Sequence, residues 1–274
     1  MPEFNFNQSK VQIEFPAVMG ILNLTPDSFS DGGLFLEPER ACEHAHQMVE
    51  EGAQIIDLGA ESTRPGSSPI SEQEELSRIL PVVEKLSKHD FVLSLDTTKP
   101  AVAQAGLQAG VHLINDVSGG APKLLDLASR FQSGFVAMHS QGKPKTMQDK
   151  PRYGKVTEEV RDYFQIRREE FKKLNLPGLW IDPGIGFGKT LEHNLSLMRE
   201  IEDFLDPDWG ILLGSSRKSW IDQLCHAPDP MDRLGGSLAS AIFAISKGVE
   251  IVRVHDVRET VQALEVSKVL AQKD

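Results

Sequence analysis

The chain alternates between short, continuous apolar runs and longer segments in which apolar residues recur every three or four positions. A continuous apolar run of about four to eight residues is typical of a parallel strand that is covered on both faces. The longer pattern is typical of an amphipathic helix that packs one face against a core. Eight runs match the strand pattern, at residues 17–23, 54–59, 91–96, 112–117, 135–139, 179–184, 210–216 and 250–256.

Helix start and stop signals punctuate the segments between these runs. Ser71 and Glu74 form a capping box, and apolar residues then follow on one helical face as far as Leu86. Pro100 stands near the first position of the next helix, and Gly110 marks its end. We expect the acidic residues 72–75 to form a solvated helix start.

Eight strand–helix units within 274 residues predict an α/β protein with a (β/α)8 TIM barrel. A doubly wound parallel sheet is the alternative, but eight units without a dinucleotide-binding glycine pattern favour the barrel. No solenoid repeat, low-complexity segment or linker interrupts the chain, so residues 1–274 are predicted to form one domain. Residues 1–16 should form a cap or hairpin at the N-terminal end of the barrel.

Composition and charge narrow the possible partners. Hydrophobic residues make up 40% of the chain and charged residues 25%, which are ordinary values for a soluble globular protein. The net charge of −11 argues against nucleic acid or an anionic membrane as a partner, because both favour Lys and Arg. Cys42 and Cys225 lack zinc-site spacing, so we expect free thiols in a reducing cytoplasm rather than a structural disulfide. We find neither a membrane-length apolar run nor a signal-peptide core in the sequence.

Polar residues fall at the ends of the predicted strands, where a barrel carries its chemistry. Asp96, Asn115 and Asp182 directly end apolar runs and should point into the barrel mouth. A buried carboxylate or amide is costly without a partner, so three together predict a polar ligand with complementary donors. Polar residues also collect at strand ends simply because these ends are exposed to water. For Asp116 and His139, ligand binding and simple exposure to water both remain open.

A second group of residues near the strand ends is cationic. Arg64, Lys218, Arg253 and His255 could bind an anion, and Asn23 offers a neutral oxygen ligand. Arg and Lys near the last two strands match the usual phosphate-binding place in barrels. We expect the acceptors and the cations to be segregated, which suits one substrate with a donor-rich flat ring and an anionic tail.

The stretch DPGIGFGKT at residues 182–190 looks like a phosphate-binding loop but does not match one. The Walker pattern requires a glycine five residues before Gly188, and Pro183 stands there without a backbone N–H to donate. We expect this glycine-rich loop to turn over the barrel mouth with Phe187 facing a ligand. The loops at residues 30–33 and 64–68 are predicted to be similarly mobile.

Seven motifs together resemble the bacterial form of the dihydropteroate synthase family, which belongs to the folate pathway. They cover the chain from about Val18 to the last helix in the expected order, and as a set they are highly specific. Ala60, Ser140 and Leu24 depart from residues common in the family, and none of them is an expected ligand contact. The motifs are MGILNLTPDSFSDGG (19–33), GAESTRPGS (59–67), SLDTTKP (94–100), INDVSGG (114–120), DPGIGFGK (182–189), SSRKS (215–219) and RVHDV (253–257).

The resemblance implies a transferase that joins 6-hydroxymethyl-7,8-dihydropterin diphosphate to 4-aminobenzoate and releases pyrophosphate, with Mg²⁺ and commonly as a homodimer. In the implied reaction pyrophosphate leaves first, and the arylamine then attacks the pterin methylene cation. The resemblance implies catalytic roles for Lys218, Asp96 and Asp182. The implied pterin contacts are Asp96, Asn115, Asp182, Lys218 and Met138; the diphosphate contacts are Asn23, which also ligates Mg²⁺, Thr63, Arg64, Arg253 and His255; the aminobenzoate contacts are Pro65, Phe187, Lys218 and Ser219.

Two other functions remain as alternatives. A pterin-binding methyltransferase barrel would share the Asp/Asn/Asp site, but it has no need of a diphosphate clamp, so Arg253 and His255 favour the synthase. A catalytically silent pterin-binding protein would be expected to have lost Lys218, Arg253 or a loop residue. Pyrophosphate release in the presence of both substrates separates the synthase from these two.

Overall fold

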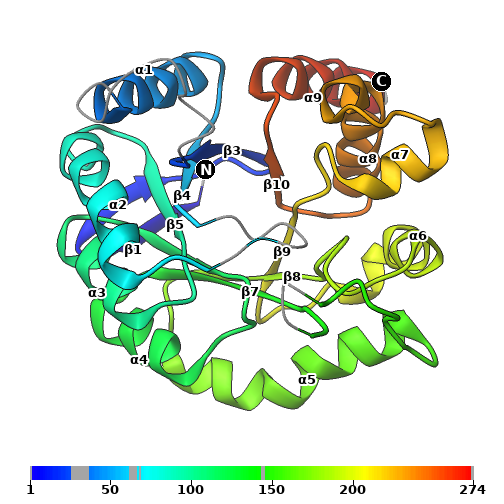
Figure 1. Ribbon diagram of the computed structural model, residues 1–274, viewed down its shortest axis with the longest axis horizontal. Helices are drawn as coiled ribbons and strands as arrows, with labels where there is room; N and C mark the ends of the chain where they lie inside the picture. The colour runs from blue at the N-terminus through cyan, green and yellow to red at the C-terminus, as the bar shows by residue number, and fades with distance from the viewer. Residues whose placement is uncertain (1, 26–36, 62–66, 68, 143–145, 273–274) are drawn as a thin grey trace.

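The computed structural model describes residues 2–25, 37–61, 67, 69–142 and 146–272 (Figure 1). Eight parallel strands close a barrel in the order β10-β3-β4-β5-β6-β7-β8-β9, which confirms the predicted (β/α)8 architecture and rules out the doubly wound sheet. Each observed strand lies within three residues of its predicted ends. The strands are β3 (Ala17–Asn23), β4 (Ile55–Gly59), β5 (Val92–Asp96), β6 (Leu113–Asp116), β7 (Gly134–Met138), β8 (Leu179–Asp182), β9 (Gly210–Leu213) and β10 (Ile251–Val254).

Helices surround the barrel, as Figure 1 shows. The Oγ of Ser71 accepts the Glu74 N–H at 3.2 Å and starts α2, whereas the Glu74 carboxylate pairs with Arg78. Pro100 begins α3 as predicted, and Gly110 follows its end with a φ of +107°. The helices are α1 (Glu37–Glu50), α2 (Glu72–Leu86), α3 (Pro100–Gln108), α4 (Pro122–Phe131), α5 (Val156–Leu174), α6 (Leu191–Arg199), α7 (Ser219–Cys225), α8 (Leu234–Ser246) and α9 (Val257–Ala271), with short 3-10 turns η2 (Ile201–Phe204) and η3 (Pro230–Arg233).

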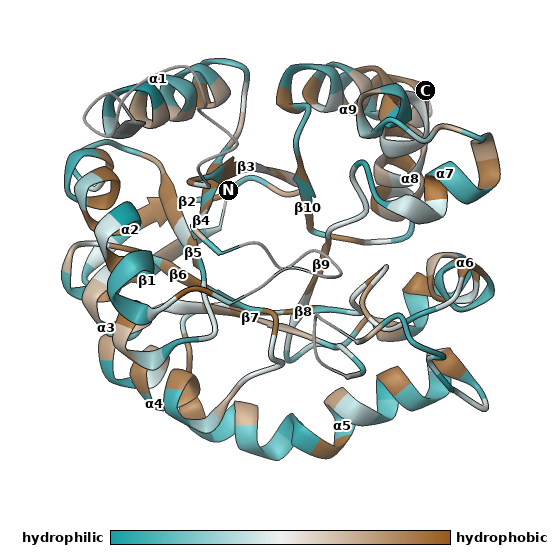
Figure 2. Cartoon of the chain, viewed as in Figure 1, coloured by the Kyte–Doolittle hydropathy of each residue, from teal (hydrophilic) through white to brown (hydrophobic). Residues whose placement is uncertain are grey.

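Apolar side chains pack on both faces of the barrel wall. One cluster lies between the strands and the helices, and Figure 2 shows the hydrophilic residues on the outer helix faces. A second cluster fills the interior of the barrel near its N-terminal end. Because every strand is covered on both faces, its residues form continuous apolar runs, which explains why the strands could be predicted.

The first residues form the predicted hairpin. β1 (Glu3–Phe6) and β2 (Ser9–Gln12) pair antiparallel. The Phe4, Phe6 and Phe15 rings lie 5.8, 6.3 and 6.2 Å from the ring of Trp180, which starts the inward face of β8. The hairpin therefore closes the N-terminal end of the barrel and leaves the opposite end for chemistry.

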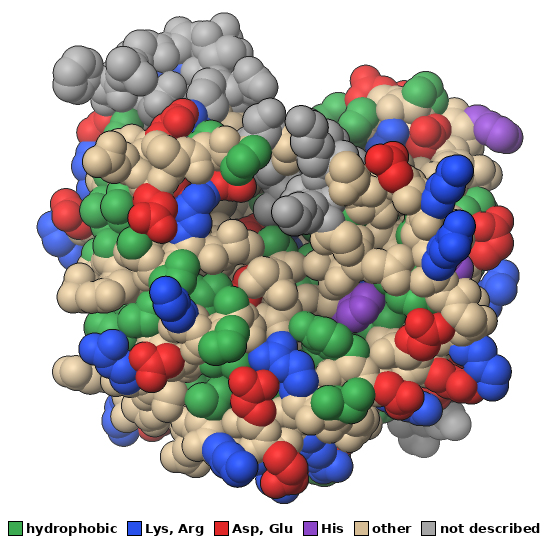
Figure 3. All heavy atoms as spheres, turned by 60° about the horizontal axis from the view of Figure 1, so that its bottom comes forward, with side chains coloured by type: hydrophobic (Ala, Val, Ile, Leu, Met, Phe, Trp, Pro, Cys, Tyr) green, Lys and Arg blue, Asp and Glu red, His purple; other side chains and the backbone are tan. Residues whose placement is uncertain are grey.

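Charges of both signs are interspersed on the face that carries α5, as the described side chains in Figure 3 show. Pairs three or four residues apart, such as Lys155 with Glu158 and Arg167 with Glu170, contribute to this pattern. Such a surface does not offer a polyanion a continuous basic patch on that face. Among the described residues, no helix combines the length and the apolar character needed to cross a membrane.

Candidate active site

Strand pleating determines which polar residues meet inside the barrel. Successive residues of a strand face opposite sides, so every second one points toward the barrel axis. At the N-terminal level the inward residues are apolar, and Ile55, Leu113 and Trp180 are examples. Two positions further along each strand, the same inward face carries Asp57, Ser94, Asn115, Met138, Asp182 and Arg253.

Asp57 is the centre of a buried polar network that our sequence prediction missed. Its carboxylate is fully buried and accepts hydrogen bonds from Ser94 Oγ at 2.5 Å and Asn115 Nδ2 at 3.0 Å. It also accepts from Arg253 Nε at 2.6 Å. The available signal was a single carboxylate inside the apolar run 54–59, but we considered only the residues at strand ends.

Arg253 joins two carboxylates of neighbouring strands, that of Asp57 within β4 and that of Asp96 at the end of β5. Its Nη2 lies 3.1 Å from Oδ2 of Asp96, while its Nε is held by Asp57. Burial raises the pKa of Asp96 to about 7, and the positive charge of Arg253 opposes this shift. A buried carboxylate with one cationic partner remains an acceptor that a ring N–H could satisfy.

The expected segregation of acceptors from cations is therefore wrong. Arg253 contacts Asp57 and Asp96 directly, and Lys218 lowers the raised pKa of the buried Asp182. Buried charges require partners, and within a narrow barrel mouth the nearest partners are groups of opposite sign on adjacent strands. Acceptors and cations are consequently interleaved.

Asp182, Lys218 and Phe187 meet on the other side of the mouth. The Asp182 Oδ1 accepts the N–H of Gly184 at 2.7 Å, which fixes the carboxylate orientation. The Lys218 Nζ donates to the carbonyl of Ile185 at 2.5 Å and lies 4.6 Å from the centre of the Phe187 ring. Burial lowers the pKa of Lys218 to about 8, and Asp182 opposes this effect.

The remaining predicted ligands lie around this centre. Asn23 ends β3 and is half-buried, and the buried Met138 ends β7. His255 follows β10, with its Nδ1 at 3.1 Å from Ser216 Oγ. Ser219 is exposed and is the first residue of α7.

Three predicted ligands lie outside the described residues. They are Thr63, Arg64 and Pro65, which belong to the range 62–66. The loops that we expected to be mobile, at 30–33 and 64–68, lie outside the described part of the chain as well, except for Ser67. These predictions stay predictions.

Asp116 and His139 have structural partners. The Asp116 carboxylate accepts the backbone N–H groups of Ser118, Gly120 and Ala121 at 2.8–3.0 Å and so shapes the loop after β6. The buried His139 ring lies against Tyr163 and faces Lys189. Both residues are buried, so they do not stand at strand ends merely because these ends are exposed to water, and their partners give both a structural role that the sequence did not predict.

Lys189 shows why the stretch 182–190 is not a phosphate loop. Its ammonium is buried, at 3.1 Å from both the Nδ1 of His139 and the carbonyl of Phe187, so it does not point toward a ligand. Gly184, with a φ of +72°, allows this packing, since a Cβ there would lie 1.8 Å from the His139 carbonyl oxygen. The glycines allow backbone segments to approach each other closely, and the buried lysine holds the loop in place through these contacts.

Replacing Lys189 with methionine should change how stability depends on pH. Burial lowers the pKa of Lys189 from 10.5 to about 7, so between these values the unfolded chain binds more protons than the folded protein. The contribution of this group to stability is therefore present above about pH 10 and is lost as the pH falls through about 7. Between pH 7 and 10, the free energy of unfolding of the wild type should rise by up to about 4 kcal/mol relative to Lys189→Met. Urea denaturation measures this difference, and parallel pH curves for the two proteins would contradict it.

A second polar cluster corrects our prediction for the acidic residues 72–75. Glu75 is buried, not solvated, and accepts from Thr97 Oγ1 at 2.6 Å. Lys99 pairs with Glu75 at 2.5 Å and also with Glu61. These groups line a cavity of about 410 Å³ that Asp96 and Phe187 also border, so the cluster adjoins the site.

Known proteins resemble this chain in sequence and in fold. Residues 19–255 match the pterin-binding enzyme family. The dihydropteroate synthase of Escherichia coli strain K12 is 46% identical over 262 residues, which cover 94% of this chain and 93% of that protein. A structure of the Xanthomonas albilineans dihydropteroate synthase with 4-aminobenzoic acid has a TM-score of 0.91 at 37% identity, covering 100% of this chain and 99% of that one. The Burkholderia cenocepacia dihydropteroate synthase complexed with 7,8-dihydropteroate has a TM-score of 0.86 at 39% identity, with coverage of 98% and 96%.

These similarities extend over almost the whole chain, and the family match runs from the first barrel strand to the last. The resemblance that the seven motifs predicted is therefore confirmed. The chain belongs to the pterin-binding enzyme family and, within that family, to the dihydropteroate synthases.

Proposed function

We propose that this enzyme condenses 6-hydroxymethyl-7,8-dihydropterin diphosphate with 4-aminobenzoate to form 7,8-dihydropteroate and pyrophosphate. The observation that carries the proposal is the convergence of Asp96, Asn115, Asp182, Lys218 and Arg253 at one barrel mouth. A flat heterocycle rich in N–H groups complements the acceptors, and an anionic leaving group complements the cations.

The pterin would bind to the acceptors at the ends of β5, β6 and β8. Asn115 donates its side-chain N–H to Asp57, so its side-chain carbonyl oxygen could accept from a ring donor. Asp182 uses Oδ1 for the Gly184 N–H, so Oδ2 can accept from the ring. Met138 would contact the apolar face of the heterocycle beside these groups.

The aminobenzoate would lie near Lys218 and Phe187, whose ammonium and ring are already in contact. We propose that Ser219 receives its carboxylate and that Pro65 packs against its ring. The Lys218 Nζ would remain close to Asp182, and hence beside the bond that the arylamine forms. Lys218, Asp96 and Asp182 are thus the proposed catalytic residues.

The diphosphate would bind near Arg253 and His255, with Thr63 and Arg64 from the loop after β4. A guanidinium has three nitrogens, and Arg253 uses Nε and Nη2 for Asp57 and Asp96. Its Nη1 is engaged by neither carboxylate and can donate to a phosphate oxygen. Arg253 could therefore bind an anion without leaving its two structural partners.

Asn23 would supply one ligand to Mg²⁺. Among the described residues, no group of three or more His, Cys, Asp or Glu side chains could hold a metal by itself. This fits Mg²⁺ in the form that is bound mainly by substrate phosphates and water, with one or two protein oxygens. When bound, the ion would neutralise charge that develops on the departing pyrophosphate.

We also propose a homodimer in the cytoplasm. Gly235, Ala239 and Phe243 are exposed along one side of α8, four residues apart, where a second copy could cover them. Cys42 and Cys225 are free thiols, as a reducing compartment favours. Sedimentation should give twice the mass of the 30.3 kDa chain, and Phe243→Asp should shift it toward one chain.

Pyrophosphate release tests the proposed function. With dihydropterin diphosphate, 4-aminobenzoate and Mg²⁺ present, the enzyme should release one pyrophosphate for each dihydropteroate formed. Omission of 4-aminobenzoate or chelation of Mg²⁺ should stop product formation. Methyl transfer from methyltetrahydrofolate without pyrophosphate release would indicate the methyltransferase instead, and pterin binding without either reaction would indicate a silent protein.

A further inference from the structure

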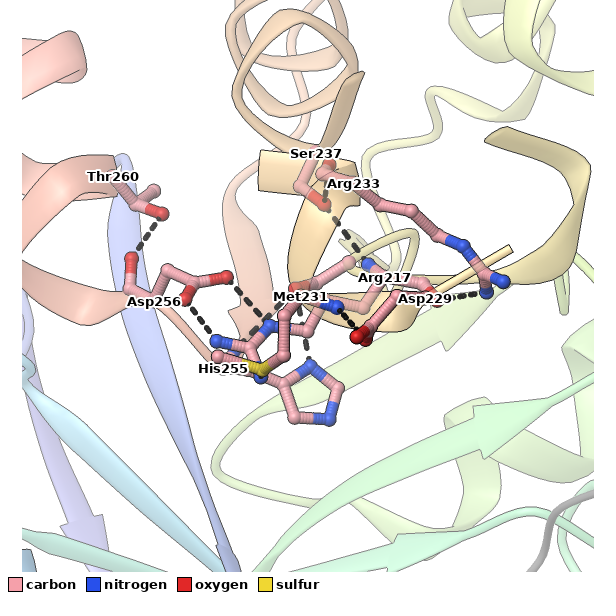
Figure 4. Close-up of polar contacts among 9 residues, drawn as sticks. Arg217, Asp229, Met231, Arg233, Ser237, His255, Asp256 and Thr260 are labelled. Carbon is pink, nitrogen blue, oxygen red and sulfur yellow. Dashed lines mark hydrogen bonds and ion pairs between the residues drawn. The ribbon is translucent and has the colours of Figure 1, made fainter. Parts of the chain in front are cut away.

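Arg217 and Asp256 belong to the motifs SSRKS and RVHDV, but the proposed substrate contacts leave both residues without a role. Figure 4 shows their side chains facing each other between the loops that follow β9 and β10. The Arg217 Nε donates to Asp256 Oδ2 at 2.9 Å, and Nη2 pairs with Oδ1. The two side chains are only 20% and 14% exposed, so solvent screens this bidentate pair little.

The backbone of Arg217 is also held on both sides. Its φ of +56° lies in the left-handed region, which a residue with a side chain rarely adopts unless its surroundings enforce it. The Arg217 N–H donates to Ser237 Oγ at 2.9 Å, and its carbonyl accepts from Arg233 Nη1 at 2.9 Å. The buried Arg233 in turn holds the carbonyls of Ala227 and Pro228 at 2.7 and 2.6 Å.

A second contact couples the same two loops one residue earlier. Ser216 Oγ lies 3.1 Å from His255 Nδ1 and accepts the backbone N–H of His255 at 3.2 Å. The ladder between β9 and β10 pairs Leu213 with Val252 at its last step. Beyond it, residues 216 and 217 are tied side by side to residues 255 and 256.

The guanidinium of Arg217 has its three nitrogens engaged. Nε and Nη2 bond Asp256, and Nη1 lies 2.9 Å from the Sδ of Met231. Arg253, in contrast, keeps Nη1 away from its carboxylate partners. The two arginines near the mouth are thus arranged for different tasks, one for a ligand and one for holding structure.

We propose that Arg217 is a positioning residue: its ion pair with Asp256 fixes the distance between Lys218 and His255, and thereby between the two substrate halves. The inference rests on the proposed function, in which Lys218 serves the pterin and aminobenzoate while His255 serves the diphosphate. Lys218 directly follows Arg217 and His255 directly precedes Asp256, so a shift of either loop would move one of these groups relative to the other.

Variants of both partners test the proposal. Arg217→Gln and Asp256→Asn should each lower kcat/KM for the condensation by about tenfold or more, mainly through kcat. The double variant should have a kcat/KM no lower than that of the less active single variant, because both changes remove the same contact. Arg217→Lys, which keeps the charge but not the bidentate geometry, should recover part of the activity. A loss of melting temperature with unchanged kcat/KM would show a merely structural pair and overturn the proposal.

Titration with inorganic pyrophosphate distinguishes positioning from direct binding. If Arg217 is a positioning residue, Arg217→Gln and Asp256→Asn should change the affinity for pyrophosphate equally. Both variants should keep the salt dependence of the wild type. If Arg217 instead bound the phosphate itself, Asp256→Asn would release the guanidinium and strengthen binding, while Arg217→Gln would reduce the salt dependence. That result would overturn the proposal.

Arg168→Gln is the matched control. Arg168 pairs with Asp208 at 2.5 Å, and the two side chains are 33% and 23% exposed. Asp208 comes just before β9 begins, so this pair lies at the N-terminal end of the barrel. Arg168→Gln should leave kcat/KM and pyrophosphate affinity unchanged. The proposed function would be refuted if the wild-type enzyme released no pyrophosphate in the presence of both substrates. The pyrophosphate titrations would still test the role of Arg217 in that case.

Discussion

Asp182→Asn should weaken pterin binding tens- to hundredfold while the barrel remains folded. The amide can keep its oxygen on the Gly184 N–H, which Asp182 Oδ1 accepts at 2.7 Å. Its NH₂ would then face the N–H groups of the ring in place of Oδ2, so one charged hydrogen bond becomes a contact between two donors. A hydrogen bond to a charged group is worth roughly 1.5–3 kcal/mol, which corresponds to the expected loss.

The fold should tolerate this change because the carboxylate is itself costly to bury. Burial raises the pKa of Asp182, opposed chiefly by Lys218, and the neutral amide avoids that cost. Calorimetric titration with a pterin measures the affinity. Asp206→Asn is the matched control. The Asp206 side chain is only 8% exposed, lies at the opposite end of the barrel and likewise accepts the N–H two residues on, that of Asp208, at 3.0 Å. Equal pterin affinity for Asp182→Asn and the wild type would remove Asp182 from the pterin site.

The strands could be predicted because both faces of each are buried, which leaves little room for polar residues until the strand ends. β9 shows the limit of this argument. The sequence predicted a strand as far as residue 216, but β9 ends at Leu213. Small residues follow, and the chain turns there so that Ser215 and Ser216 bond residues of α8 and the β10 loop. A run of Gly and Ser does not distinguish a strand from such a turn.

The site was predictable where the signal was local. Asp96, Asn115 and Asp182 end apolar runs, and the structure buries all three at the mouth. A carboxylate inside an apolar run, at Asp57, is also a local signal, and it was overlooked. Glu75 gave no local signal, because an acidic residue in the first turn of a helix is ordinarily solvated. Its burial depends on Lys99, 24 residues later, and therefore on how α2 packs beside the start of α3.

Pairing of the site charges required the closed barrel. Arg253 lies 196 residues from Asp57 and 157 from Asp96, yet it contacts both. β10 is next to β3 only because the barrel closes, and that closure brings the last strand close to β4 and β5. The sequence placed Arg253 and Asp96 at strand ends, but it did not indicate that Arg253 would pair with Asp96 or with Asp57.

Lys218→Met should lower turnover by at least an order of magnitude with little change in melting temperature. Methionine keeps most of the apolar stem that packs near Phe187 and removes the ammonium. One charged contact to the reacting system is worth about 2–4 kcal/mol. Burial lowers the pKa of Lys218 to about 8, so wild-type turnover should fall as the pH rises through about 8 and the charge is lost. The variant should lack this limb of the pH profile.

Arg253→Met provides the contrast, because removal of Arg253 and removal of Lys218 leave different groups without their cationic partner. Without Arg253, the carboxylates of Asp57 and Asp96 lose a cation at 2.6 and 3.1 Å, and breaking such a buried pair costs about 3–5 kcal/mol. Arg253→Met should therefore lower the melting temperature, weaken pyrophosphate binding and make that binding less sensitive to salt. Lys218→Met should lower the melting temperature less and leave pyrophosphate binding largely unchanged. Its ammonium donates to the backbone carbonyl of Ile185 and acts on the Asp182 carboxylate through charge, whereas Arg253 bonds two carboxylates directly. Near-normal turnover in Lys218→Met, or the same combination of losses in both variants, would show that the pocket is not divided between these two residues as proposed.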